Sequence, residues 1–450
     1  MVTELICYKQ KMIKLDFDIL NELDNVGNEA YKLIVELFPI CRSITGEGVR
    51  KSLKIIQDQI PIKINEVPSG QKVYDWIIPK EWNIRDAYIK NSKGEKIVNF
   101  QKSNLHVMSY SVPIKGKFSL EELKKHLHSL QEYPEWIPYL TSYYNENWGF
   151  CISHNQLKNL TDDEYEVKID SELKDGSLTY GEFVIPGKRE EQILLSCYVC
   201  HPSMCNDNLT GVALLTLLAK YLRDKELEYT YHFLFIPETI GAITWLSQNE
   251  DKVSKIKCGL VATCLGDSGI STYKKTKNGN SIIDRIVKKV LDDSKSKFEL
   301  VDFFPSGSDE RQFSSPGFNL EIGSLMRAMY GKFPEYHTSA DNLDFINTES
   351  LSDSFKKYLN VILVLENNKI FRSLNPKCEP QLGRRGLYRL IGSQKNEHLD
   401  ELAILWVLNM SDGTNSLLDI SECAGLSFLQ VKKTAQILFE KNLLEIVENN

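Results

Sequence analysis

Four side chains that can bind a metal ion or accept a proton follow apolar segments of this sequence. His201 and Asp207 lie in CHPSMCNDNLTG, directly after the apolar run QILLSCYV, and Glu238 follows the run TYHFLFIP. His337 lies in EYHTSADN, before the last long helical pattern of the main part of the chain. Functional side chains of α/β proteins gather where strands end and loops begin. Two imidazoles, a carboxylate and a spare glutamate are the groups of a hydrolytic zinc site, in which the glutamate accepts a proton from water.

Three of these residues also have a simpler interpretation. His201 alone, after a strand, is typical of a hydrogen-bonded structural histidine. Asp207 lies between two asparagines and suits the cap of the helix expected from residue 211 equally well. Glu238 is also compatible with a carboxylate stabilised by a helix dipole. Their joint placement at successive strand ends favours the metal site.

The cysteines predict thiols, without a disulfide framework. Ten of them are scattered along a long chain in which no export signal is recognised. Cys197 and Cys200 form a CxxC pair, but no second pair at similar spacing completes a structural zinc site. A redox motif should open a helix after the strand, whereas Cys197 still lies inside the apolar run. Buried, inert thiols are the preferred interpretation.

The elements that position these residues alternate between strand and helix. The expected strands are 192–199, 230–237 and 257–265, and the expected helices are 211–223, 240–248 and 350–366. Such alternation predicts an α/β fold, with a mixed or parallel sheet flanked by helices. Between about residues 70 and 155 short β-rich pieces and four of the six tryptophans indicate a separate small domain. After residue 387 three short helical patterns and a strand suggest a winged helix.

Length, composition and charge narrow the class of protein. The chain has 450 residues, 42% of them hydrophobic and 26% charged, with a net charge of −7; this indicates a globular protein of two or three domains. No apolar run reaches the roughly 18 residues of a membrane span, and no secretory segment is recognised, so a cytoplasmic location is expected. The segment 380–450 carries nine acidic and seven basic residues and lacks the basic face that DNA-binding winged helices need.

Longer motifs carry a resemblance to known proteins. The runs HPSMCNDNLTG, PETIG, SGSDERQF and EYHTSADN resemble the zinc aminopeptidase superfamily, which includes bacterial leucyl aminopeptidases and glutaminyl cyclases. With PICRSITGEG, VYDWIIPKEWNIRDAYI, NLHVMSYSVP, IPYLTSYYNENWGFC and SLLDISECAGL, nearly the whole chain is similar to an uncharacterised bacterial aminopeptidase-like family associated with polysaccharide biosynthesis.

The resemblance implies an architecture of three parts. It implies a zinc-aminopeptidase-like core with a mixed sheet flanked by helices, an inserted small β-rich domain and a C-terminal winged helix. On this sequence the core is expected at 1–65 and 156–375, the insertion at 66–155 and the winged helix at 380–450. The inserted aromatic residues are interpreted as the core of a small domain, with a lid over the site or a sugar-binding surface as alternatives.

Carried over by position, the resemblance assigns most of the metal site. His201 matches the first histidine ligand, Asp207 the aspartate that bridges two metals, and His337 the last histidine ligand. Glu238 matches the general base. Arg42 and Arg311 are candidates for binding a substrate carboxylate or the oxyanion, with a structural ion pair as an equal alternative for each.

The sequence also departs from the superfamily pattern. The second of two adjacent glutamates is Thr239, an aspartate ligand aligns with Thr263, the acidic residue after the first histidine is Ser203, and a histidine is replaced by Glu310. Two lost ligands leave too few groups for two metals, so one zinc ion is expected, with water as the fourth ligand. Asp267 is an alternative ligand.

Two classes of function follow. The first is a zinc-dependent hydrolase of an amide bond, aminopeptidase-like, acting on a peptide or a small amide; an N-acyl amino-sugar amidase is a variant of it. The second is a catalytically reduced binding or regulatory protein that acts through its winged helix. No membrane or nucleic-acid partner is expected, and a homo-oligomer is compatible with either function.

Overall fold

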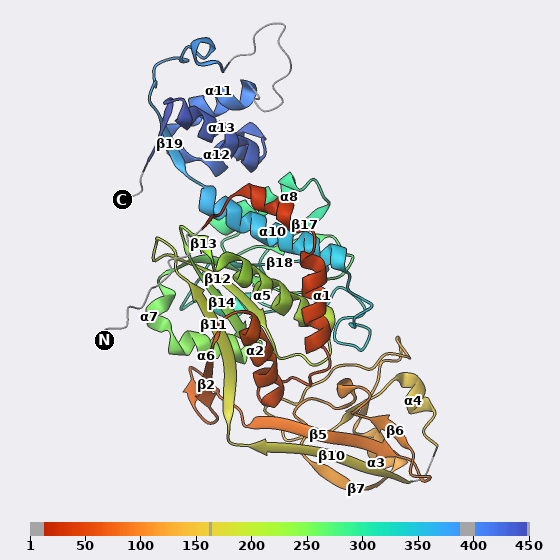
Figure 1. Ribbon diagram of the computed structural model, residues 1–450. Helices are drawn as coiled ribbons and strands as arrows, with labels where there is room; N and C mark the ends of the chain where they lie inside the picture. The colour runs from red at the N-terminus through yellow and green to blue at the C-terminus, as the bar shows by residue number, and fades with distance from the viewer. Residues whose placement is uncertain (1–12, 162–163, 388–400, 448–450) are drawn as a thin grey trace, which may run out of the picture. The chain divides into compact units, whose positions relative to one another are not determined.

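The computed structural model describes residues 13–161, 164–387 and 401–447 (Figure 1). Within these ranges the chain forms two units. Unit 1 comprises 13–14, 23–284 and 297–356, and unit 2 comprises 15–22, 285–296 and the described residues from 357 onward. Helices α8 (Ile282–Asp293) and α10 (Thr348–Asn367) contribute residues to both units. None of the described helices is both long and apolar enough to cross a membrane.

An eight-stranded mixed sheet is the centre of unit 1. Its strands, in spatial order, are β17 (Phe298–Val301), β16 (Ser271–Lys274), β18 (Ile322–Met326), β15 (Ile256–Ala262), β12 (Gln192–Tyr198), β14 (Thr230–Ile236), β11 (Ser177–Ile185) and β2 (Lys63–Pro68). The four central strands β18, β15, β12 and β14 are parallel, and antiparallel pairs flank them. Strands β12 and β14 are buried almost throughout, as expected of continuous apolar runs covered on both faces.

Helices pack against this sheet. The helices of unit 1 outside the insertion are α1 (Val26–Leu37), α2 (Glu47–Gln59), α5 (Thr210–Leu222), α6 (Ile240–Gln248), α7 (Glu250–Val253) and α9 (Glu310–Phe313). In α1 the buried side chains recur at helical spacing, with Val26, Ala30, Leu33 and Leu37 on one face. Helix α5 contacts α1 and the central strands and is buried on nearly every side, which explains its continuous apolar sequence. The predicted α/β class is confirmed.

A four-stranded antiparallel sheet forms the β-rich insertion. Its strands are β6 (Lys96–Asn99), β5 (Glu81–Lys90), β10 (Glu164–Lys174) and β7 (Ile114–Ser119), and Figure 1 shows it set apart from the eight-stranded sheet within unit 1. The sheet extends past residue 155 because β10 pairs with both β5 and β7. Inside it the indole N–H of Trp82 donates to the Ser111 carbonyl at 2.9 Å, and the Tyr110 ring stacks on the Trp82 ring.

Short elements complete the insertion and the edges of unit 1. They are α3 (Leu120–Lys124), α4 (His154–Lys158), the strand pairs β1 (Ile13–Lys14) with β13 (Lys225–Glu226), β3 (Lys72–Val73) with β4 (Trp76–Ile77), and β8 (Leu127–His128) with β9 (Phe150–Cys151). Helices α3 and α4 each begin with a capping box, built on Ser119 and Ser153.

Unit 2 contains the predicted winged helix. Its elements are β19 (Ile370–Ser373), α11 (Glu401–Met410), β20 (Asp412–Ser416), α12 (Leu417–Ala424), α13 (Phe428–Glu440) and β21 (Leu444–Ile446), with sheet order β20-β19-β21. Helix α12 begins with a capping box at Ser416 and ends at Gly425, whose positive φ terminates it. Residues 388–400 and 448–450 of the predicted 380–450 domain lie outside the described residues. The sheet of this unit already begins at β19, before residue 380.

Candidate metal centre

The candidate residues lie in loops around the carboxyl ends of the central parallel strands. His201 follows β12, and Asp207 lies in the turn Cys205–Leu209, where the backbone is kinked before α5 begins. Glu238 lies between β14 and α6. His337 comes from the loop between β18 and α10. Residues up to 136 positions apart in the sequence therefore meet because they follow parallel strands of one sheet.

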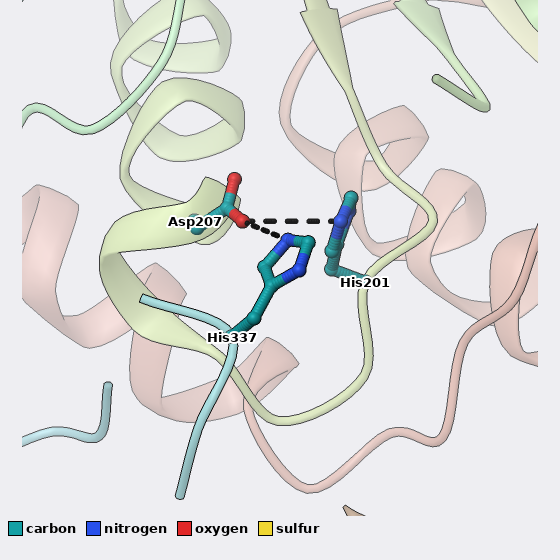
Figure 2. A group of neighbouring side chains, drawn as sticks. All are labelled: His201, Asp207 and His337. Carbon is teal, nitrogen blue, oxygen red and sulfur yellow. Dashed lines mark ion pairs between the residues drawn. The ribbon is translucent and has the colours of Figure 1, made fainter. Parts of the chain in front are cut away.

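Three side chains converge on one point (Figure 2). The Oδ2 atom of Asp207 lies 3.0 Å from Nε2 of His337 and 3.8 Å from Nε2 of His201. One potential ligand atom from each residue lies within 4.8 Å of the others. Glu238 lies at the edge of this group, with its Oε2 atom 3.7 Å from Nε2 of His201. The structure thus brings together all four residues that the sequence predicts for the centre of the site.

The ionisation of these groups suits metal binding. Burial lowers the pKa of His201 to about 4, so its imidazole is neutral at pH 7 and has a lone pair to offer. Burial alone would raise the pKa of Asp207, but the neighbouring His201 and His337 and the Tyr198 hydroxyl outweigh it and hold that pKa below its usual range. Asp207 is therefore a carboxylate at neutral pH.

The three side chains fit a zinc ion. Oδ2 of Asp207 is buried and accepts no hydrogen bond, which is costly for a carboxylate unless a cation is bound. Two imidazole nitrogens and one carboxylate oxygen are ligands typical of catalytic zinc. Ligands about 2.0 Å from a tetrahedral ion lie about 3.3 Å from one another, close to the 3.0 Å and 3.8 Å separations from Oδ2.

Glu238 is held beside the group by its backbone. Its N–H donates to the Cys200 Sγ at 3.2 Å, so this thiol has a structural use. Burial, followed by the nearby charges of Asp309 and Asp207, raises the pKa of Glu238 well above its usual range. A carboxyl group with a raised proton affinity is a stronger base once ionised.

All nine cysteines in the described ranges are free thiols.

Asp341 anchors the turn that presents Asp207. Its Oδ1 accepts the backbone N–H groups of Cys205 and Asn206 at 3.1 and 2.6 Å, and its Oδ2 accepts the N–H of Asp207 at 2.9 Å. Burial raises the pKa of Asp341 to about 8, and the amide donors oppose this rise. One buried carboxyl group therefore fixes three successive residues of the turn.

Replacing Asp341 with Asn should destabilise unit 1 and weaken metal binding. An amide nitrogen must replace one carboxyl oxygen, which leaves at least one buried backbone N–H without an acceptor, at a cost of about 1–3 kcal/mol. Calorimetric unfolding and zinc titration measure the two effects. Asp284→Asn is the matched control, because Asp284 is also buried and accepts from Tyr273, Thr276 and Ser281. It should lower stability without changing the affinity for zinc; equal loss of affinity in both variants would contradict the prediction.

The remaining polar candidates have other partners. Asp267 accepts hydrogen bonds from Asn206 Nδ2 at 2.9 Å and from the N–H groups of Gly269 and Ala328, and it is not in the converging group. Thr239 donates its N–H to Asp309 Oδ1 at 2.7 Å. Neither residue offers a carboxylate to a second metal ion.

The two candidate arginines occupy different environments. Arg42 is 1% exposed and donates to the carbonyl oxygens of His201 and Leu37 at 2.8 and 2.6 Å, with its second terminal nitrogen unpartnered. Arg311 donates to the Thr239 hydroxyl at 3.1 Å, and its Nε is unpartnered. Arg42 thus supports the loop that carries His201, whereas Arg311 lies beside the residue that follows Glu238. Their roles toward a substrate stay predictions.

Tyr139 contacts the candidate metal centre, although the sequence did not predict it as a site residue. It belongs to the insertion, yet its ring centroid lies 5.3 Å from that of His201 and 5.2 Å from that of His337. Its backbone N–H donates to the His337 carbonyl at 2.8 Å. Tyr198 is a second such residue. In the sequence it looks like part of an apolar strand, and its position as the last residue of that strand is the only signal of a role in the site.

Comparisons with known proteins place the chain in a family. A family model described as "Domain of unknown function (DUF4910)" matches residues 31–368. The chain belongs to this family. A second model, a winged helix-turn-helix, matches residues 369–446.

A relative similar over nearly the full length comes from Clostridium acetobutylicum. It is a "Putative polysaccharide biosynthesis protein with aminopeptidase-like domain", 60% identical over 421 residues, covering 94% of this chain and 97% of the relative. A crystal structure of a "putative peptidase" from the same organism has 58% identity and a TM-score of 0.91, over 96% of this chain and 99% of that one. The predicted resemblance to an aminopeptidase-like family is confirmed.

More distant structures share the fold. The zinc aminopeptidase BSAP from Bacillus subtilis has a TM-score of 0.54 at 12% identity, covering 75% of this chain and 94% of that one. A peptidase M28 precursor from Shewanella amazonensis has a TM-score of 0.53 at 14% identity, covering 78% and 97%. These likenesses confirm the aminopeptidase-like fold of the core.

Proposed function

We propose that this protein is a zinc-dependent hydrolase of an amide bond, aminopeptidase-like in its chemistry. The observation that carries the proposal is the convergence of His201, Asp207 and His337 on one point, with Glu238 at its edge. The shared fold with a zinc aminopeptidase of Bacillus subtilis supports it. The relatives' names, which speak of an aminopeptidase-like domain and a putative peptidase, support a peptide as the substrate.

One zinc ion would be held by His201, Asp207 and His337. A zinc ion bound there would polarise a substrate carbonyl and lower the pKa of water to near 7. Glu238, beside His201, accepts the proton of the attacking water and then donates it to the leaving amine. Arg311, whose Nε has no partner, is the candidate for binding a substrate carboxylate or the developing oxyanion.

Metal removal tests this function. The purified protein should contain one zinc ion per chain by elemental analysis and should cleave members of a panel of aminoacyl and N-acyl amides. Chelation should abolish cleavage, and added Zn²⁺, but not Mg²⁺, should restore it, because nitrogen-rich sites disfavour magnesium. Stoichiometric zinc without cleavage of any amide would contradict the hydrolase, and absence of zinc would favour a binding or regulatory protein.

Unit 2 gives little support to nucleic-acid binding. Lys432 lies on α13, the helix that would read DNA in a winged helix, but its Nζ pairs with Asp16 at 2.7 Å and only 17% of its side chain is exposed. A basic side chain neutralised within its own unit is a poor phosphate ligand. We therefore propose that no nucleic acid binds to unit 2. The proposed substrate is a peptide or a small amide.

A further inference from the structure

Tyr198 connects two loops of the candidate metal centre. It is the last residue of β12, and only 2% of it is exposed. Its hydroxyl donates a short hydrogen bond to Oδ1 of Asp207 and lies 2.7 Å from the Thr263 hydroxyl, which follows β15. An ionised carboxylate only accepts, so the single Tyr198 proton goes to Asp207 and the Thr263 hydroxyl donates to Tyr198. The three groups form a directed chain that ends on Asp207.

This chain makes the two oxygens of Asp207 different. Oδ1 accepts from Tyr198, while Oδ2 faces the two imidazoles and accepts no hydrogen bond. Asp207 is itself 0% exposed, so its oxygens are shielded from bulk solvent. The carboxylate is therefore arranged to bind one cation through Oδ2.

The side of Asp207 that faces Tyr198 is occupied by neutral groups. A second cation bound to Oδ1 would have to displace the Tyr198 hydroxyl. It would then meet the Thr263 hydroxyl, which carries no charge. Asp267, the alternative carboxylate, already accepts hydrogen bonds at both of its oxygens.

We propose that Tyr198 is a positioning residue that confines Asp207 to a single metal ion bound through Oδ2. The inference rests on the proposed function only in requiring a metal at this centre. Hydrogen bonds to a ligating side chain orient it, and their loss typically weakens metal binding 10–100-fold. Tyr198 and Thr263 would thus set both the affinity and the number of ions.

Zinc affinity and stoichiometry of the full chain test the role of Tyr198. Competition with a chromophoric chelator should give a Kd about 10–100-fold higher for Tyr198→Phe than for the wild type. Co²⁺ should show an altered visible absorption spectrum in this variant, because Asp207 can then bind through both oxygens. Thr263→Val should weaken zinc binding to a smaller degree, and Thr263→Ser, which keeps the hydroxyl, should preserve it.

Tyr273→Phe is the matched control. Tyr273 is a buried tyrosine of the same unit whose hydroxyl donates to Asp284 at 2.9 Å, so this variant loses a comparable hydrogen bond outside the metal centre. Its Kd should stay within twofold of the wild type. Wild-type affinity in Tyr198→Phe, an equal loss in Tyr273→Phe, or two zinc ions per wild-type chain would overturn the proposal.

The experiment separates this inference from the proposed function, because activity is not its readout. A chain that binds one zinc ion but cleaves no amide would end the hydrolase proposal, and the role of Tyr198 would still be decided by the Kd values. A wild-type chain that binds no zinc would overturn both.

Discussion

Replacing Glu238 with Gln should lower kcat for amide hydrolysis by about 10²–10⁴-fold, the usual contribution of a general base, while the zinc content stays at one ion per chain. The carboxylate lies 3.7 Å from His201 but outside the three converging ligand atoms. A glutamine has nearly the same shape and cannot accept the proton of water. The variant therefore separates proton transfer from metal binding, with initial rates and elemental analysis as the two measurements.

Glu182→Gln is the control for this substitution. Glu182 lies on β11 and pairs with His232 at 3.3 Å, so the variant also neutralises a carboxylate beside an imidazole, within the sheet. Its kcat should stay within a few-fold of the wild type. Full activity in Glu238→Gln would sink its assignment as the base, and loss of zinc from that variant would instead identify Glu238 as a ligand.

Replacing Lys274 with Met should lower the free energy of unfolding of unit 1 by about 3–5 kcal/mol, the typical cost of an unpaired buried charge. Lys274 and Glu310 are both 0% exposed, and Nζ of Lys274 lies 2.6 Å from Oε1 of Glu310. In the described chain, the only other donors to the Glu310 carboxylate are the Tyr330 and Ser324 hydroxyls. Without the ammonium, the carboxylate stays buried without a counter-charge.

The structural change caused by Lys274→Met should also reach the metal centre through the backbone. Glu310 follows Asp309, whose Oδ1 accepts the N–H of Thr239, the residue after Glu238.

Lys257→Met is the control for the Lys274→Met substitution. Lys257 pairs with Glu191 at a partly exposed site, so its loss should lower the free energy of unfolding by less than about 1 kcal/mol. Denaturant unfolding measures both variants. The double variant Lys274→Met/Glu310→Gln should recover part of the loss, and a cost below 1 kcal/mol for Lys274→Met alone would contradict the account.

The sequence permits prediction of the strands and of the groups at their ends. The strand predicted at 230–237 is observed as Thr230–Ile236, because a buried parallel strand requires a continuous apolar run. The same reasoning places His201 and Glu238 at one edge of the sheet. What the pattern does not encode is which distant groups complete the site.

Asp341, Tyr198 and Tyr139 show why the rest was missed. Asp341 accepts hydrogen bonds from backbone N–H groups about 135 residues earlier in the chain. The hydrophobic periodicity of a sequence gives no information about such a contact. Tyr198 reads as one more apolar residue of a buried strand, since its ring is buried and only its hydroxyl is polar. Tyr139 belongs to a segment whose aromatic residues indicate a small core, and its contact with two histidines depends on how that segment packs on the rest of unit 1.

The contact of Tyr139 with His337 has a consequence for the order in which the molecule is made. Ile137 and Ser339 exchange hydrogen bonds across roughly 200 residues, and the earlier partner leaves the ribosome first. Because the N-terminal part of a chain is made first, the residues of the insertion are available for pairing before His337 is synthesised. The loop that carries His337 is then expected to pair with Ile137 and Tyr139 as the rest of unit 1 forms. The insertion thus helps to hold the loop of the final ligand, and shortening it around Ile137 and Tyr139 should displace His337 while His201 and Asp207 stay in place at the end of β12.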